Sequence, residues 1–84
     1  MEKNEIERAI LGYMVNHPQA RDTIEGIARW WILRQRINLE IARVVDVVDR
    51  LVSANFLVEK KLADSTKVYC LNKDKLEEIE TLLH

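Results

Sequence analysis

The side chains best suited to bind a ligand are basic ones, and they occur from the middle of the chain onward: Arg34, Arg36, Arg43, Arg50, Lys60, Lys61 and Lys67. Guanidinium and ammonium groups bind anions through charge and hydrogen bonds, and arginine can donate in pairs to a phosphate or a carboxylate. From Asp74 onward, acidic residues dominate instead. Because the formal net charge is only -1, the whole molecule exerts little attraction on nucleic acid or on an anionic membrane. Any attraction to an anionic partner must therefore be local to these basic residues.

Catalytic and metal-binding chemistry has little support in the sequence. His17 precedes Pro18 and His84 is the last residue, so periodicity brings no acid, base or nucleophile beside either histidine. The single cysteine, Cys70, excludes an internal disulfide and a zinc site built from several thiolates. The sequence also lacks a glycine-rich phosphate-binding loop. We therefore expect a binding protein that has no enzymatic activity and needs no metal or cofactor.

The composition predicts one small, helix-rich domain over residues 1–84. Hydrophobic residues make up 48% and charged residues 32%, with two glycines and one proline, which is typical of a packed domain and not of a disordered tail. The longest apolar runs are far shorter than the roughly 20 residues that cross a bilayer. The first residues lack the basic and then apolar pattern of a signal peptide. We expect a cytoplasmic protein.

Two helices are predicted before all of these basic residues. Asn4, three residues before a glutamate, fits a capping box and begins a helix that runs to about Asn16. Pro18 disfavours helical geometry in the residue before it and so ends this helix. Asp22, again three residues before a glutamate, is expected to cap a second and shorter helix.

A third helix, from Leu39 to Ala54, has the clearest pattern. With about 100° between successive residues, one apolar arc is expected to face the core: Ile41, Val44, Val45, Val48, Leu51 and Val52. The opposite arc, expected to face outward, holds Leu39, Arg43, Asp46, Val47 and Arg50, with Glu40 and Asp49 toward its flanks. Asn55 follows the arc and tolerates the left-handed conformation that commonly closes a helix.

The period then changes to that of a hairpin, with strands at 56–62 and 67–71 around a polar turn. Asp74 is expected to cap a last helix. One face of that helix carries Leu76, Ile79, Leu82 and Leu83.

The order helix, helix, helix, hairpin, helix resembles a winged helix-turn-helix domain, the DNA-binding module of many small regulators. The similarity is strongest at the junction from the third helix to the wing. Leu51 stands for the family's leucine near the end of the recognition helix, Asn55 for its left-handed residue, and 57–61 for the apolar pair and charged residues that lead into the wing. Tyr69 and Leu71 match the aromatic and the leucine of the returning strand. The resemblance implies a mainly α fold with a small β-hairpin wing, α-α-α-β-β-α. Glycine is more usual than asparagine at position 55, and the link before the third helix is longer and more charged than the family's turn.

The resemblance also implies that the third helix meets double-stranded DNA. Arg43 and Arg50 would then contact guanine edges or phosphates, and Arg34, Arg36, Lys60, Lys61 and Lys67 would hold phosphates beside the helix. Other interpretations stay open. Asp46 can pair with Arg43 and Arg50 along a solvated helix face, and lysines on an edge hairpin also prevent edge-to-edge aggregation.

Some apolar residues are candidates for contact with a protein. Trp30 lies at the border of the second helix's apolar stripe, where it either meets a partner or covers the rim of the core. Val47 lies on the outward arc of the third helix. Leu82 and Leu83 end the chain with little left to cover them, so we expect a homodimer, and the resemblance implies that it pairs through the terminal helix and the first helix. The leading hypothesis is a small DNA-binding transcriptional regulator, and the alternative is a winged-helix module that binds another protein and no DNA.

Overall fold

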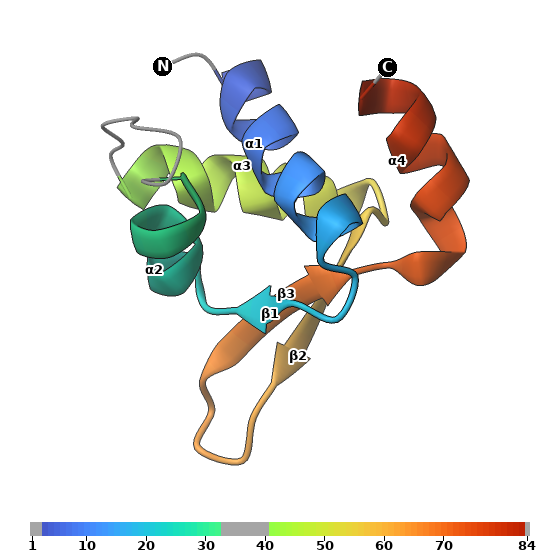
Figure 1. Ribbon diagram of the computed structural model, residues 1–84. Helices are drawn as coiled ribbons and strands as arrows, with labels where there is room; N and C mark the ends of the chain where they lie inside the picture. The colour runs from blue at the N-terminus through green and yellow to red at the C-terminus, as the bar shows by residue number, and fades with distance from the viewer. Residues whose placement is uncertain (1–2, 33–40, 84) are drawn as a thin grey trace.

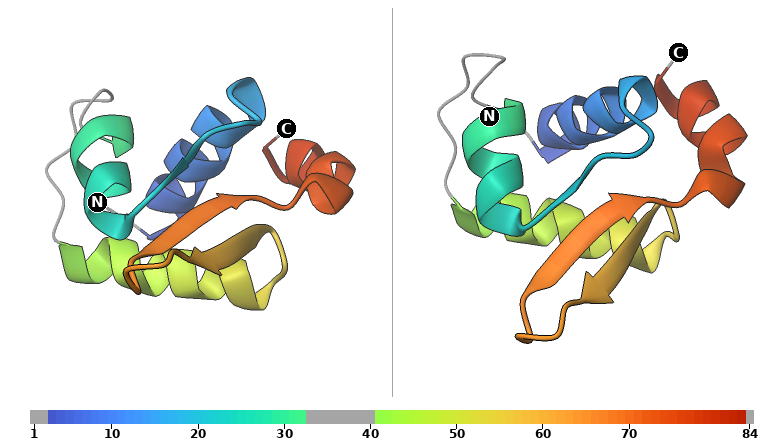
Figure 2. Two further views of the ribbon diagram at one scale, coloured as in Figure 1. Left: turned by 90° about the horizontal axis from the view of Figure 1, so that it is seen from below. Right: turned by 60° about the horizontal axis from the view of Figure 1, so that its bottom comes forward.

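The computed structural model describes residues 3–32 and 41–83 of the chain. Along the sequence the elements are α1 (Lys3–Asn16), β1 (Arg21–Asp22), α2 (Ile24–Gly26), the π-helical segment η1 (Ile27–Ile32), α3 (Ile41–Ser53), β2 (Leu57–Lys61), β3 (Lys67–Leu71), the 3-10 turn η3 (Lys73–Lys75) and α4 (Leu76–Leu83). The sheet lies against one side of the helices, and α4 packs beside α1 (Figures 1 and 2). In the described part of the chain, no helix combines the length and the apolar character needed to cross a membrane.

The core lies where α1, α3, the sheet and α4 meet. Ile10 and Met14 of α1, Val48 of α3 and Ile79 of α4 are fully buried in one cluster. Each such side chain stabilises the fold by roughly 1.5 to 3 kcal/mol relative to leaving it in water. Because one side of α3 packs in this core, its opposite face is exposed to solvent.

The sheet has three antiparallel strands in the order β1-β3-β2, and its first strand was not predicted from the sequence. Arg21 lies opposite Cys70 and Asp22 opposite Tyr69, so β1 pairs with β3 on the side away from β2. Two residues are too few for an alternating pattern to show. The hairpin itself is confirmed at Leu57–Lys61 and Lys67–Leu71.

The predicted starts of the first two helices were wrong. Asn4 lies inside α1, which already includes Lys3. The cap of α2 is Thr23 and not Asp22: Thr23 Oγ1 accepts a hydrogen bond from the Gly26 N–H at 3.1 Å. Asp22 instead accepts from the Thr23 N–H at 2.7 Å, and its carboxylate lies against Gly26, where any Cβ would overlap it. A side chain at position 26 would therefore require the Asp22 carboxylate to move.

The turn from α3 into the wing has the predicted geometry. Asn55 has φ of 66°, and the Phe56 N–H donates to the Leu51 carbonyl at 2.9 Å, which closes the helix. At the tip of the wing Ser65 also has positive φ, 72°. The Asp64 carboxylate there accepts hydrogen bonds from Thr66, which lower the pKa of Asp64.

Candidate nucleic-acid interface

The outward face of α3 is charged in both signs. Val44, Val47, Val48 and Leu51 are buried, and the exposed residues on the opposite side are Ala42, Arg43, Asp46, Asp49, Arg50 and Ser53. Two guanidinium groups and two carboxylates thus share one solvated surface. Such a surface can contact bases or phosphates through its arginines, whereas its carboxylates repel the phosphate backbone.

Val47 does not belong to this outward face, and its assignment as a partner contact was wrong. Its side chain is 0% exposed, whereas Ile41, expected in the core, is 45% exposed. The buried arc is rotated toward Val47 because α1 packs against α3 on that side. Val45 and Val52, on the other border of the arc, are only half-buried.

Arg50 is directed toward α1. Its Nη2 atom lies 3.0 Å from Oε2 of Glu7, and the Arg50 side chain remains 54% exposed. Arg50 therefore pairs with a residue of another helix, Glu7, which helical spacing within α3 could not indicate. Arg43 precedes Arg50 by seven residues, close to two turns, so both arginines lie on the α1 side of the outward face.

Asp49 lies on the other side of that face, toward the wing. Burial, the hydrogen bond to Glu59 and the charge of Glu59 raise the pKa of Tyr69 in β3, and the charge of Asp49 is the last and smallest cause. The Tyr69 hydroxyl donates to Glu59 Oε1 at 3.2 Å. The wing side of α3 is therefore the more acidic side.

The wing lysines divide between the two faces of the sheet. Lys61 and Lys67 are directly opposite one another in the register of β2 and β3, so their side chains leave the same face. Lys67 also lies 3.9 Å from Glu59 Oε1. Lys60 alternates with Lys61 along β2 and faces the other way. The structure thus brings Lys61 and Lys67 together and separates Lys60 from them.

A pocket of about 590 Å³ separates the start of α3 from the wing. Ile24, Ile41, Val45 and Tyr69 give it apolar walls, and Lys67 and Glu25 bring opposite charges to its edge. The half-exposed Ile41 is therefore part of this pocket. The pocket is too mixed in charge to hold an anion by itself.

The remaining predicted contacts are placed as follows. Arg34 and Arg36 lie outside the described residues, and so does the side chain of Trp30. On α4, Leu82 is 42% exposed and Leu83 is half-buried. The Leu83 carbonyl accepts a hydrogen bond from Arg8 of α1 at 3.3 Å, which ties the end of α4 to α1.

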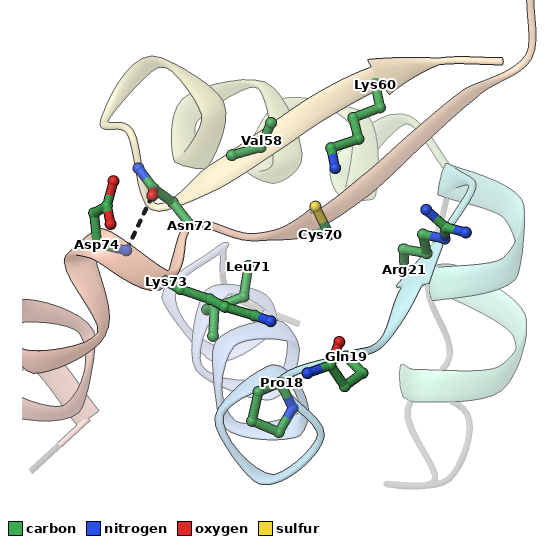
Figure 3. A pocket seen from close by; sticks show the side chains of 10 residues that line it. All are labelled: Pro18, Gln19, Arg21, Val58, Lys60, Cys70, Leu71, Asn72, Lys73 and Asp74. Carbon is green, nitrogen blue, oxygen red and sulfur yellow. Dashed lines mark hydrogen bonds between the residues drawn. The ribbon is translucent and has the colours of Figure 1, made fainter.

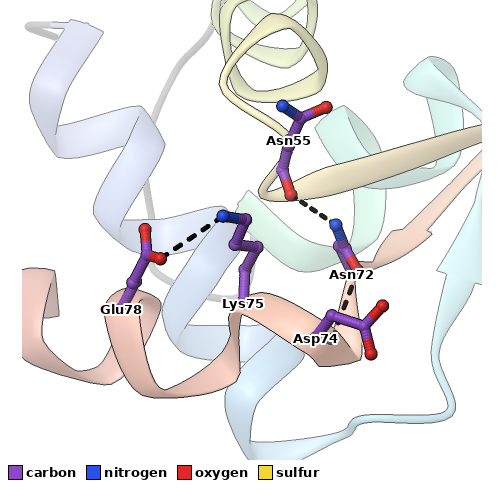
Figure 4. Close-up of polar contacts among 5 residues, drawn as sticks. All are labelled: Asn55, Asn72, Asp74, Lys75 and Glu78. Carbon is purple, nitrogen blue, oxygen red and sulfur yellow. Dashed lines mark hydrogen bonds and ion pairs between the residues drawn. The ribbon is translucent and has the colours of Figure 1, made fainter.

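Asn72 is a structural residue that sequence reasoning missed, and Asp74 was wrongly expected in its place. Asn72 Oδ1 accepts from the Asp74 N–H at 3.2 Å and caps η3, while Asn72 Nδ2 donates to the Asn55 carbonyl at 2.7 Å (Figure 4). One side chain therefore joins the α3-to-wing turn to the start of the last helix. The sequence did offer a signal for this cap, because asparagine is a preferred N-cap residue and Asn72 stands two residues before Asp74.

No group of three or more histidine, cysteine, aspartate or glutamate side chains in residues 3–32 and 41–83 is arranged to hold a metal ion.

Comparison with solved structures identifies the fold. The chain is similar to "F93 from STIV, a winged-helix DNA-binding protein", with a TM-score of 0.72 and 23% sequence identity, over 98% of this chain and 85% of that one. No model of a known protein family and no curated protein matches the sequence. The winged-helix fold that the sequence predicted is therefore confirmed, with β1 as an addition to the predicted order.

Proposed function

We propose that this protein binds double-stranded DNA through α3 and the wing, and that it regulates transcription in the cytoplasm. The observation that carries the proposal is the similarity, over nearly the whole chain, to a solved winged-helix protein that is described as DNA-binding. The exposed arginines of α3 and the paired lysines of the wing supply the chemistry.

In this mode α3 enters the major groove and the wing meets the neighbouring backbone. Arg43 is exposed on α3 and is the best-placed candidate to read a base edge. Lys61 and Lys67 would hold phosphates, as would Arg34 and Arg36, which precede α3 in the sequence. Arg50 is held toward α1 by Glu7, so it is a less direct candidate than Arg43.

The two aspartates of α3 limit affinity for an arbitrary duplex. Asp46 and Asp49 are exposed on the same face as Arg43, and each opposes the phosphate charge that dominates non-specific binding. We therefore expect weak binding to random sequence, with tighter binding only where base contacts compensate.

Fluorescence anisotropy of a labelled random duplex at low and moderate salt tests the proposal. We expect binding that weakens with salt, and Arg43→Gln and Lys61→Gln should each weaken it several-fold and make the salt dependence shallower. Lys75→Gln is the matched control, since Lys75 carries the same charge on η3 and pairs there with Glu78 at 3.3 Å. Absence of binding at low salt would reject the proposal and favour the module that binds another protein.

The proposal includes a homodimer formed through α4. Leu82 leaves a large apolar side chain 42% exposed beside α1, and burial of that side chain against a second copy would be favourable. Sedimentation equilibrium at tens of micromolar should give a dimer mass that Leu82→Glu lowers. Leu62→Glu is the control, because Leu62 is 45% exposed near the tip of the wing. A monomeric wild-type protein would rule out the dimer without bearing on DNA binding.

A further inference from the structure

A second basic surface lies on the opposite face of the sheet from the core. A pocket of about 540 Å³ is bounded there by the strands, by the connection from α1 to β1, and by the segment that leads from β3 into η3 (Figure 3). Its basic residues are Arg21, Lys60 and Lys73, which come from three separate segments of the chain. Asp74 is the carboxylate at its edge.

The strand register places these residues on one face. Arg21 is opposite Cys70, Cys70 is opposite Val58, and Lys60 is the next residue but one after Val58. Side chains alternate between faces along a strand. The neighbouring positions Leu57 and Tyr69 are buried on the other face, in the cluster that contains α3, while Leu71 at the end of β3 belongs to that cluster and also lines the pocket. A ligand in the pocket is therefore separated by the sheet from the outward face of α3.

The three cations of the pocket have no acidic partner among the described residues. Arg50, Lys67 and Lys75 each form an ion pair. Among residues 3–32 and 41–83, no ion pair joins Arg21, Lys60 or Lys73 to a carboxylate. Three cations that line one hollow, beside a single carboxylate, create a positive local potential in a molecule with a net charge of -1.

The hollow also has a suitable shape and lining. Its volume lies within the range of about 300 to 1,000 Å³ that is common for small-molecule sites. Val58 and Cys70 form part of its floor, Gln19 adds a polar amide, and the Lys60 and Lys73 side chains both extend over it (Figure 3). This combination offers an apolar contact and several donors to one ligand.

We infer that this pocket binds a small molecule with a phosphate or polycarboxylate group. Arg21 would donate paired hydrogen bonds to the anionic group, and Lys60 and Lys73 would add compact charges from the far strand and from η3. Concave shape and position favour a small ligand over the DNA backbone, because the sheet separates the pocket from α3. Binding of such a ligand does not require the protein to bind DNA.

Titration with inorganic pyrophosphate, followed by NMR shifts of the backbone amides, tests the inference. We expect saturable shifts centred on Arg21, Cys70 and Lys73, with a Kd that Arg21→Gln and Lys73→Gln each raise roughly tenfold. Arg29→Gln is the matched control, since Arg29 is exposed on η1 and does not line the pocket. Shifts spread over all basic residues without saturation, or an equal loss in Arg29→Gln, would overturn the inference.

A second arm separates a free ligand from DNA phosphate. The affinity of the same variants for the labelled duplex is measured. If the pocket is a site for a small molecule, Arg21→Gln and Lys73→Gln should weaken DNA binding no more than Arg29→Gln does. If they weaken it as much as Arg43→Gln, the pocket is part of the DNA surface and the inference is wrong. If no variant binds DNA, the pyrophosphate result still decides the question of the pocket.

Discussion

Asn72 is the side chain whose removal should disturb the most elements at once. Asn72→Ala loses the cap of η3 and the hydrogen bond to the Asn55 carbonyl, so we expect the free energy of unfolding to fall by about 1 to 2 kcal/mol. Urea denaturation measures the change. Asn4→Ala is the control: Asn4 is exposed within α1, where alanine is the better helix former by a few tenths of a kcal/mol. Equal losses in the two variants would contradict the role of Asn72.

Tyr69 should make stability depend on alkaline pH. Burial, and then the hydrogen bond and charge of Glu59, raise the pKa of Tyr69 above its ordinary value of 10.0. The folded state therefore holds this proton more tightly than the unfolded state. Its contribution is complete below pH 10 and is lost as the pH rises toward the pKa of the folded state.

Urea unfolding of the wild type and Tyr69→Phe at several pH values above and below about 10 tests this dependence. Lysines titrate in the same range, so the informative quantity is the difference between the two proteins. We expect the stability advantage of the wild type to shrink as the pH rises. A constant difference would show that the Tyr69 pKa is unchanged by folding.

At the scale of elements, the sequence predicted each long segment and missed the details that depend on packing. The pattern of α3 indicated a helix from its spacing alone, and the turn at Asn55 followed from the chemistry of left-handed residues. The direction of the buried arc could not be read in the same way. Valines occupy both borders of the arc, and only the position of α1 decides that Val47 is covered and Ile41 is not.

The rotated arc can be checked with one substitution made at two positions. Val47→Ala leaves a cavity among fully buried neighbours and should lower the free energy of unfolding by about 2 kcal/mol. Val45→Ala removes the same atoms from a half-buried site and should cost about half as much. Chemical denaturation of both variants gives the comparison. The buried arc expected from the sequence includes Val45 and not Val47, so it predicts the larger loss of stability for Val45→Ala. That result would support the arc expected from the sequence and contradict the rotated one.

At the scale of the whole molecule, the distribution of charge was less predictable than the fold. The basic residues are close in sequence, but strand alternation sends Lys60 and Lys61 to opposite faces of the sheet, and Glu7 draws Arg50 toward α1. Arg21 was not predicted as a binding residue because β1 was not predicted, and only the pairing of β1 with β3 places Arg21 beside Cys70. Separate basic surfaces on the two faces of the sheet therefore follow only from the topology.

If α3 and the wing meet DNA, the position of a charge should matter more than the net charge. Asp49→Asn and Glu77→Gln each change the formal net charge from -1 to 0, but Asp49 is exposed on α3 toward the wing and Glu77 is exposed on α4. Removal of a carboxylate beside the phosphates should raise affinity for the random duplex several-fold at low salt, whereas a change beyond the Debye length of about 10 Å should have little effect. Anisotropy titrations of both variants measure the difference. Equal gains would show that the duplex responds to the overall charge of the molecule and not to this face, and the assignment of α3 and the wing as the DNA surface would be wrong.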